Sequence, residues 1–242
     1  MNQKIIFSSE VADLIEQPKP SLLTIPEAYK KMTKKAPNKL PNDLTVKACM
    51  PFLDALTSGY IITFPIDMCI YLQDKTDEKG ETKTFFTWNK NENFPAKFEN
   101  LIDIQLHTSD QISDDLRSSY RTIDVIFKIL NPWHIKTPPG YSCIFTQPFN
   151  RNLPFKIIDG IVDTDVFEYR INFPAFWTIP LTQKEYLIKK GTPLAMVIPF
   201  KRESWKMKIE KRETETPEMY LKRSNIFIDW YKKLRWQKKS YK

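Results

Sequence analysis

The sequence predicts a mainly β protein, folded as a distorted barrel or a sandwich, with an N-terminal arm and a basic C-terminal helix. Short alternating or wholly apolar runs recur at close spacing and are separated by Pro and Gly, as in strands joined by turns. No alternation of strands with long helices is visible, so we do not expect a parallel α/β sheet. Hydrophobic residues form 41% of the 242 residues, which is enough for a substantial core.

The chain divides into an arm, a core domain, and a helix with a tail, covering residues 1–44, 45–203 and 204–242. In the arm, Thr24 to Met32 predicts a short helix with Thr24 as its cap and Pro26 in its first turn. In the last segment, Thr216 and Pro217 predict the start of a helix that runs to about Trp236.

The first half of the core domain begins with helical spacing at 45–57, where Pro51 must lie in an early turn. The apolar run Tyr60–Leu72 predicts one or two buried strands divided by Pro65. A polar hairpin loop around Gly80 then leads to a partner strand at 84–88.

The second half of the core domain carries a possible helical turn at 110–117 and then the densest apolar patterning. Strands are predicted at 122–129, 141–146, 155–159, 167–173 and 194–200. The last of these is apolar throughout, so we expect it to be a central strand. The aromatic cluster at 173–177 either closes a core or stacks on a base or sugar.

The formal charge of +8 belongs to the C-terminal segment. Residues 201–242 hold fourteen Lys/Arg and six Asp/Glu, which leaves 23 of each sign in the first 200 residues. The three cysteines form no C-x-x-C pair, so we expect reduced thiols in an intracellular protein. No run of about 18 apolar residues is present, so we expect no membrane span.

The C-terminal tail interleaves cations with aromatic residues, which suits phosphate attraction combined with base stacking. The candidate nucleic-acid contacts are Lys232, Lys233, Arg235, Trp236, Lys238 and Lys239. The same pattern also fits a solvated helix end, where cations are favourable, or an arm that docks on a neighbouring subunit.

Three motifs in the core domain resemble the β-clip superfamily of dUTPases and dCTP deaminases. They are Pro138-Pro-Gly-Tyr141, Gly160-Ile-Val-Asp-Thr-Asp165, and the run from Ile188 to Phe200. Their order and spacing agree with the family over about 65 residues. The resemblance implies a β-clip-like fold, and it also implies a trimer as one possible homo-oligomer.

The same resemblance implies a site. Asp163 matches the aspartate that contacts the sugar and orients the attacking water. The candidate ligand-binding positions are Tyr141, Asn150, Arg151 and Asp165. The sequence also departs from the family: Val166 replaces the stacking tyrosine, and Gln147-Pro-Phe-Asn-Arg replaces the phosphate-binding serine motif. Most of the catalytic set is therefore missing.

Asp159, Asp163 and Asp165 lie close together around Gly160. They could hold a divalent cation, or they could cap backbone amides in a turn. We favour the turn. The two histidines, His107 and His134, have no second ligand at metal spacing, so no metal site is predicted. A cofactor is expected only under the nucleotidase alternative, as Mg²⁺.

The whole chain is also similar to a family encoded by tailed phages, and that similarity assigns no activity. We therefore expect a non-enzymatic assembly or accessory protein that acts through contacts, in the host cytoplasm or the virion. It would be a homo-oligomer that could also contact other phage proteins. The alternatives are a divergent dUTPase-like protein that binds or hydrolyses nucleotides, and a nucleic-acid binder that uses the tail.

Overall fold

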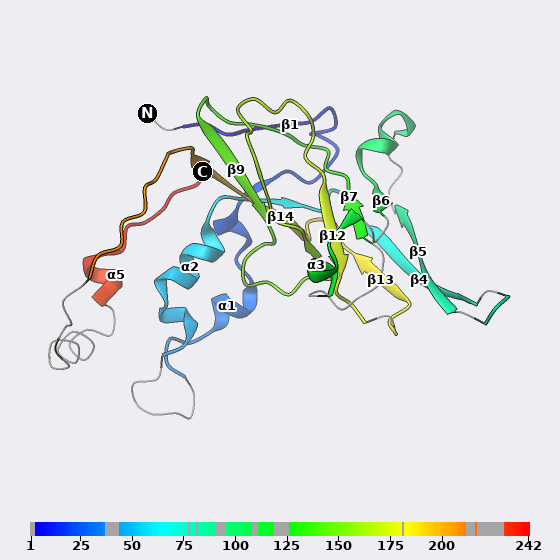
Figure 1. Ribbon diagram of the computed structural model, residues 1–242, viewed down its shortest axis with the longest axis horizontal. Coiled ribbons are helices and arrows are strands. Elements are labelled where there is room, and N and C mark those ends of the chain that lie inside the picture. The colour runs from blue at the N-terminus through cyan, green and yellow to red at the C-terminus, as the bar shows by residue number, and fades with distance from the viewer. Residues whose placement is uncertain are drawn as a thin grey trace.

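The computed structural model describes residues 3–36, 44–76, 78–80, 82–90, 95–107, 111–118, 126–180, 182–211, 216 and 230–242. Within these residues the protein is mainly β, with fourteen strands in four sheets and short helices (Figure 1). Each of these sheets has two open ends, so the described strands do not close into a barrel. The predicted fold class is confirmed in its sandwich form.

A five-stranded antiparallel sheet contains the run that we expected to be central. Its order is β11 (Gly160–Val162), β9 (Tyr141–Thr146), β14 (Pro193–Lys201), β3 (Tyr60–Thr63) and β2 (Lys19–Pro20). β14 lies in the middle, and its residues from Ala195 to Val197 are fully buried. An apolar run of this length is stable there because both of its faces are covered.

Three smaller antiparallel sheets complete the strands. One has the order β10 (Phe155–Ile157), β12 (Phe173–Trp177), β7 (Ile126–Ile129) and β6 (Ile104–His107). Another has the order β13 (Glu185–Ile188), β4 (Met68–Thr76) and β5 (Thr82–Lys90). The smallest pairs β1 (Ile6–Ser8) with β8 (His134–Lys136).

One face of β12 joins these sheets into a single core. Its Phe173 packs against Phe145 of β9, with ring centroids 6.0 Å apart. Trp177 points to the same side of the strand, since strand side chains alternate. It meets Phe86 of β5 and Tyr186 of β13 edge-on. The four-stranded sheet therefore forms one layer, and the five- and three-stranded sheets share the other.

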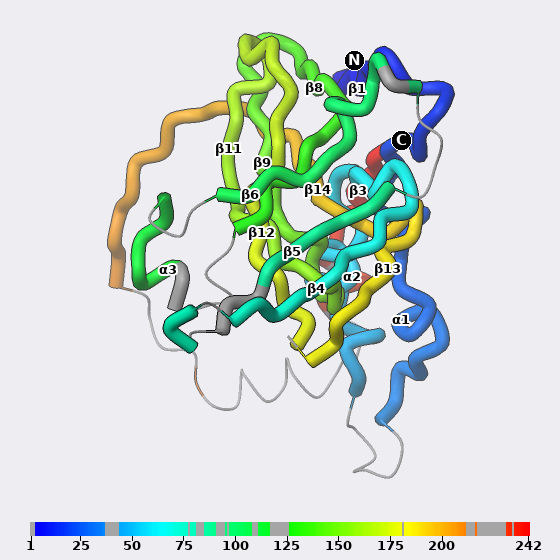
Figure 2. The backbone as a smooth tube through the Cα atoms, turned by 90° about the vertical axis from the view of Figure 1, so that its right-hand side faces the viewer, coloured from blue at the N-terminus to red at the C-terminus, as the bar shows by residue number. Residues whose placement is uncertain are grey.

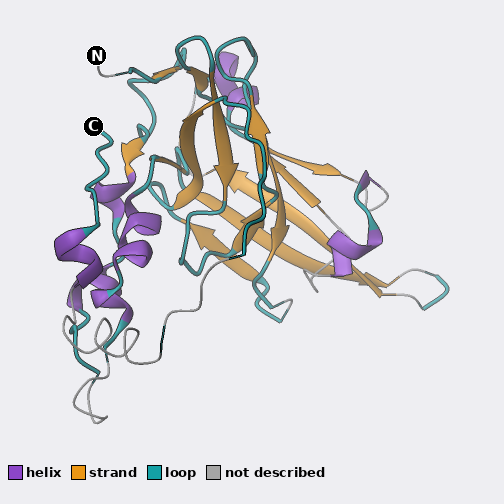
Figure 3. Cartoon of the chain, turned by 60° about the vertical axis from the view of Figure 1, so that its left-hand side comes forward, coloured by secondary structure: helices purple, strands orange, loops and turns teal. Residues whose placement is uncertain are grey.

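The described helices are short: η1 (Ser21–Thr24), α1 (Glu27–Lys31), η2 (Val46–Ala48), α2 (Met50–Thr57), η3 (Ala96–Leu101), α3 (Asp114–Ser118) and α5 (Trp230–Leu234). Of these, α1, α2 and α5 lie on the same side of the sheets (Figures 1 and 3). Pro51 lies in the first turn of α2, as predicted. α1 starts later than predicted, after Pro26 in the cap position, because the Thr24 hydroxyl bonds to the carbonyl of Ser21.

Most of the predicted strands are confirmed, including the division at Pro65 and the β4–β5 hairpin. The strand predicted at 167–173 is wrong: β12 begins only at Phe173. Here the carbonyl of Ile171 and the side chain of Asn172 bond to the buried Asn131, so this backbone has no strand partner. Residues 122–125 of the predicted strand at 122–129 lie outside the described residues.

The N-terminal arm belongs to the same core as the sheets. Val11 and Ile15 are buried among the core side chains, and β1 pairs with β8. The backbone amide of Ser21 donates to the carbonyl of Gly59 at the start of β3. None of the helices in the described part of the chain has the length and apolarity that a bilayer crossing requires.

Candidate functional site

The predicted catalytic Asp163 lies in a cluster built around Arg202, the first residue after β14. Arg202 Nη1 lies 3.2 Å from Asp163 Oδ1 and donates to Asp165 Oδ1 at 2.7 Å, while Nη2 reaches Asp165 Oδ2. Asp163 also accepts a hydrogen bond of 2.6 Å from the hydroxyl of Ser142. We call these four residues the Arg202 cluster.

Asp165 is the more enclosed of the two carboxylates in the Arg202 cluster. Its side chain is 5% exposed, against 58% for Asp163. It accepts from the two Arg202 nitrogens and from the backbone amide of Gly140. The hydrogen bond from Arg202 is the main reason that the pKa of Asp165 falls to about 2. The same contact raises the pKa of Arg202.

The Pro138-Pro-Gly-Tyr turn is hydrogen-bonded to this cluster. The backbone amide of Arg202 donates to the carbonyl of Gly140, and Nη1 donates to the carbonyl of Tyr141. Thr137 and Thr164 share a buried hydrogen bond of 2.7 Å. Two of the three motifs that carry the β-clip resemblance are thus tied to each other and to the end of β14.

Cys143 lies behind this turn and is fully buried. Burial raises the pKa of its thiol to about 11, so it stays protonated at neutral pH. A protonated, inaccessible thiol is a poor nucleophile, so Cys143 serves as a core residue.

Asp159 has other partners than the Arg202 cluster. Its carboxylate accepts a hydrogen bond of 2.6 Å from the hydroxyl of Thr146 and a longer one, of 3.4 Å, from the backbone amide of Gln147. Asp163 and Asp165 thus share Arg202, while Asp159 and Asp165 also accept from the backbone amides of Gln147 and Gly140, as aspartates in turns do. Across the described residues no group of three His, Cys, Asp or Glu side chains is arranged to hold a metal ion.

Asn150 and Arg151 have contacts elsewhere. Asn150 adopts a left-handed backbone (φ 55°) in the turn after β9. Arg151 donates to the carbonyl and hydroxyl of Thr24, at 2.6 and 2.9 Å, and its burial lowers the pKa of the guanidinium. None of the contacts among the described residues joins Asn150 or Arg151 to Asp163. Of the five candidate site residues, the structure thus brings together Asp163, Asp165 and the backbone of Tyr141. Asn150 and Arg151 are not part of this group.

The aromatic cluster of β12 closes the core, which was one of the two interpretations of its sequence. Trp177 is 2% exposed and packs among Phe86, Phe127 and Tyr186. Phe167 is 41% exposed and touches Tyr169 edge-on.

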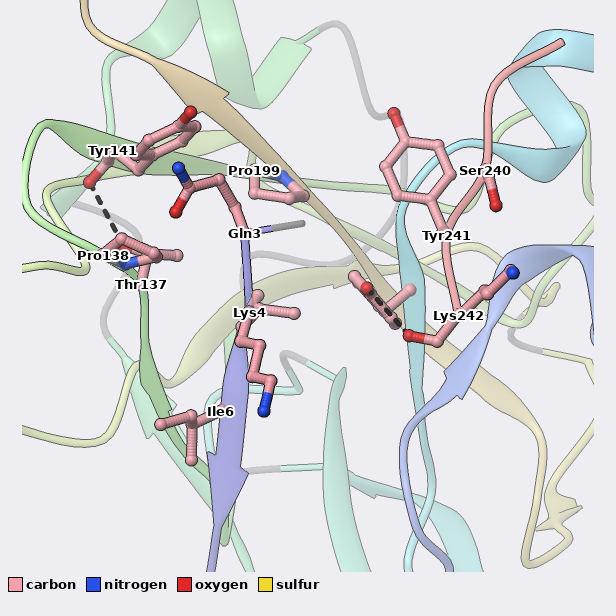
Figure 4. Close-up of a pocket in the computed structure, with 12 residues that line it drawn as sticks. Gln3, Lys4, Ile6, Thr137, Pro138, Tyr141, Pro199, Ser240, Tyr241 and Lys242 are labelled. Atoms are coloured by element: carbon pink, nitrogen blue, oxygen red, sulfur yellow. Dashed lines mark hydrogen bonds between the residues drawn. The ribbon is translucent and has the colours of Figure 1, made fainter. Parts of the chain in front are cut away.

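The side chain of Tyr141 lines a cavity of about 530 Å³. Tyr141 and Tyr241 stand on opposite sides of it, with Pro199 between them (Figure 4). The lining residues are Gln3, Lys4, Ile5, Ile6, Tyr60, Thr137, Pro138, Tyr141, Pro199, Ser240, Tyr241 and Lys242. The lining combines tyrosine rings and prolines with Lys4 and Lys242.

The C-terminal tail docks back onto the protein. The indole of Trp236 donates to both carboxylate oxygens of Asp54 in α2 at 3.0 Å, and Lys239 Nζ lies 2.6 Å from the same carboxylate. Tyr241 packs edge-on against Tyr60 of β3. Two of the candidate nucleic-acid contacts, Trp236 and Lys239, are therefore engaged by the protein itself. The other four, Lys232, Lys233, Arg235 and Lys238, are exposed.

Residues 203–211 run out from the end of β14 and leave the body of the protein in both views (Figures 1 and 2). We call this extended segment the arm of β14. Trp205, Met207 and Ile209 alternate with charged residues and are 87%, 88% and 84% exposed. The only ion pair formed within these nine described residues joins Lys208 to the neighbouring Glu210.

Sequence reasoning missed two residues that organise these surfaces. Arg202 was placed at the end of the predicted core domain and given no role, although it directly follows an apolar strand. Asp54 was placed in a helix with no role. Neither has a local motif, since their partners are 37 and 182 residues away. The arm did carry a signal, the alternation Trp205-Lys-Met-Lys-Ile209, which is typical of a strand.

No known family model matches the chain, and no curated protein matches it either.

Proposed function

We propose that this protein is a non-enzymatic assembly component, of the tailed-phage type that its sequence resembles, and that it acts by binding other chains through the arm of β14. The observation that carries this proposal is the exposure of Trp205, Met207 and Ile209, each above four-fifths. A monomer gains nothing by holding three large apolar side chains in water. Burying each of them is worth about 1.5–3 kcal/mol.

The form of the arm supports the same proposal. Side chains at 205, 207 and 209 lie on one face of an extended chain, and the backbone between them is unpaired within the described residues. Segments of this kind bind by adding a strand to an exposed sheet edge, where apolar residues at alternate positions fill the partner's surface. Trp is also the residue type most enriched among dominant interface contacts.

The contacts of Asp163 also support binding through the arm. Its carboxylate helps to hold Arg202, and Arg202 fixes where the arm leaves β14. The residue that would orient a water in a nucleotidase thus supports the base of a contact segment.

The test is the oligomeric state, measured by size-exclusion chromatography with light scattering. We expect the wild-type chain to form a homo-oligomer and the variant Trp205→Ser/Met207→Ser/Ile209→Ser to have the mass of one chain. The control Leu22→Ser/Leu23→Ser removes two exposed apolar residues of η1 and should leave the oligomer intact. A wild-type chain of single-chain mass at high concentration, or an arm variant that still assembles, contradicts the proposal.

A second candidate is nucleotide binding in the cavity beside Tyr141, favoured by its three tyrosines and by Lys4. Pyrimidine nucleotides should then raise the melting temperature of the wild-type protein but not of Tyr141→Ala. Replacement of the exposed Tyr231 by Ala is the control. Hydrolysis with Mg²⁺ that is lost in Asp163→Asn would extend this candidate to an enzyme, whereas the absence of any nucleotide effect removes it.

A further inference from the structure

The base of the arm is held rigidly although the arm itself is exposed. Arg202 is bound through its backbone amide and its guanidinium to the Pro-Pro-Gly-Tyr turn and to the turn after β11. The chain therefore leaves the five-stranded sheet at a defined point beside Asp163 and Asp165. An extended segment of nine residues beyond that point reaches about 30 Å.

A second exposed apolar surface lies next to this point of departure. It consists of Ile161 on β11 and of Val166, Phe167 and Tyr169 in the segment that follows. These side chains are 66%, 71%, 41% and 75% exposed. β11 is the terminal strand of its sheet, so one side of its backbone is unpaired within the described residues. We call this surface the β11 edge.

The arm and the β11 edge are complementary in charge as well as in polarity. Around its apolar residues the arm carries three exposed lysines, Lys206, Lys208 and Lys211, against two exposed acids, Glu203 and Glu210, of which Glu210 pairs with Lys208. The β11 edge is flanked by the exposed acids Asp159, Asp163 and Glu168. Opposite charges around an apolar contact favour one orientation of the two surfaces and disfavour other partners.

Both surfaces are exposed in the same chain, so the arm does not cover its own β11 edge. Figure 2 shows the arm continuing outward past β11, away from the sheet. A second copy of this chain supplies a partner for each surface. Its arm can pair with the β11 edge of the first copy, and its β11 edge can receive the arm of the first copy. Such a contact is head-to-tail and closes into a ring when the rotation between copies permits.

We infer that the arm of one copy adds along the β11 edge of a second copy, placing Trp205, Met207 and Ile209 against Ile161, Val166 and Tyr169. This inference rests on the proposed function and specifies its partner. Pairing with β11 would satisfy backbone groups of the open edge.

The experiment compares two variants of the full chain, alone and mixed. The arm variant, Trp205→Ser/Met207→Ser/Ile209→Ser, keeps an intact β11 edge. The edge variant, Ile161→Ser/Val166→Ser/Tyr169→Ser, keeps an intact arm. Since all six positions are exposed, we expect both variants to keep the far-ultraviolet circular dichroism of the wild-type protein.

Each variant alone should have the mass of one chain, because each lacks one half of the contact. Mixed, the two should form a species of two chains, joined by the arm of the edge variant and the edge of the arm variant. A fluorescent edge variant titrated with the arm variant measures this association by anisotropy. Adding Lys206→Glu/Lys208→Glu to the edge variant should weaken it by about tenfold or more.

The outcomes separate this inference from the proposed function. If the edge variant assembles like the wild-type chain while the arm variant does not, the arm binds elsewhere and only the β11 edge is wrong. If the arm variant assembles like the wild-type chain, the proposed function is itself wrong. If the two variants fail to associate when mixed although the wild-type chain assembles, the arm and the edge are not partners.

Discussion

Arg202 connects three stretches of sequence that lie far apart: the Pro-Pro-Gly-Tyr turn, the turn after β11 and the end of β14. Its guanidinium contacts both oxygens of the Asp165 carboxylate through two different nitrogens. A lysine has the same charge but cannot make this two-pronged contact. The position therefore requires arginine for its geometry.

The Asp165 carboxylate makes the stability of the protein depend on pH in a defined window. Folding lowers its pKa from 3.8 to about 2, so the ionised group stabilises the folded state above pH 3.8. This contribution is lost as the pH falls toward about 2. We expect Asp165→Asn to be less stable than wild type at neutral pH and to lose less stability on acidification.

Urea denaturation at a series of pH values from about 6 to 3 measures this difference. Ser142→Ala is the control, because it changes a neighbour of Asp163 and leaves every carboxylate in place. Parallel stability curves for wild type and Asp165→Asn across the window would show that the carboxylate does not titrate as stated.

Gly59 is the glycine whose replacement should cost most. It has φ +62°, and a Cβ atom there would lie 2.1 Å from the carbonyl oxygen of Val197 in β14. Gly191 also has a positive φ, +83°, but a Cβ atom on it meets nothing. We expect Gly191→Ala to lower the free energy of unfolding by about 1–2 kcal/mol, from backbone conformation alone.

Gly59→Ala should lose clearly more than Gly191→Ala, because β14 has to move as well. Urea denaturation of both variants gives the comparison. Equal losses at the two positions would mean that the approach of β3 to β14 is looser than the structure shows.

At the scale of elements, α2 holds the C-terminal tail. Asp54 accepts from the indole of Trp236 and pairs with Lys239. The indole hydrogen bond to a carboxylate is worth about 1.5 kcal/mol, close to tenfold in the population of the released tail. We expect Asp54→Ala to release residues 236–242 from the helix.

Hydrogen exchange of the backbone amides in residues 236–242 measures this release. Exchange should be about tenfold faster in Asp54→Ala than in wild type. Glu27→Gln is a matched control, since it removes an exposed carboxylate that pairs with Lys30 on α1. Unchanged exchange in Asp54→Ala would show that other contacts hold the tail.

The strands show which elements a sequence can predict. β9, β14 and the β4–β5 hairpin are marked by local features: unbroken apolar runs, alternation, and turn residues between partners. Residues 167–173 have the same alternation, yet Asn131 binds the backbone carbonyl of Ile171 from 40 residues away. A local pattern contains no information about such a contact, so the predicted strand is absent.

The same distinction applies to the candidate site. The resemblance picked out Asp163, Asp165 and Tyr141, and the structure does bring them together. Their common partner Arg202 lies 37 residues from Asp165, at the end of the predicted core domain, and no motif marks it. Arg151 was grouped with them because of its position in a motif, but it bonds to Thr24 in the N-terminal arm.

At the scale of the whole molecule, the sheets share one core around Phe64. Phe64 is 1% exposed, packs against Phe155 of β10, and exchanges backbone hydrogen bonds with the turn before β14. We expect Phe64→Ala to lower the free energy of unfolding by about 3–5 kcal/mol, from lost burial and the cavity that remains. Because the core is shared, unfolding should stay a single transition.

Urea denaturation followed by tryptophan fluorescence and by circular dichroism tests both statements. The control is Phe85→Ala on β5, where the ring is 46% exposed and should cost less than about 1 kcal/mol. Two separate transitions in wild type would show that the three-stranded sheet unfolds independently of the rest.

The position of β14 also determines how the protein would carry a mechanical load. A pull on the arm enters the body through β14, which is bonded to β9 on one side and to β3 on the other. The force would act along the strand, across the direction of its interstrand hydrogen bonds. Those bonds would have to break together instead of one after another, so the arm is attached where the five-stranded sheet best resists tension.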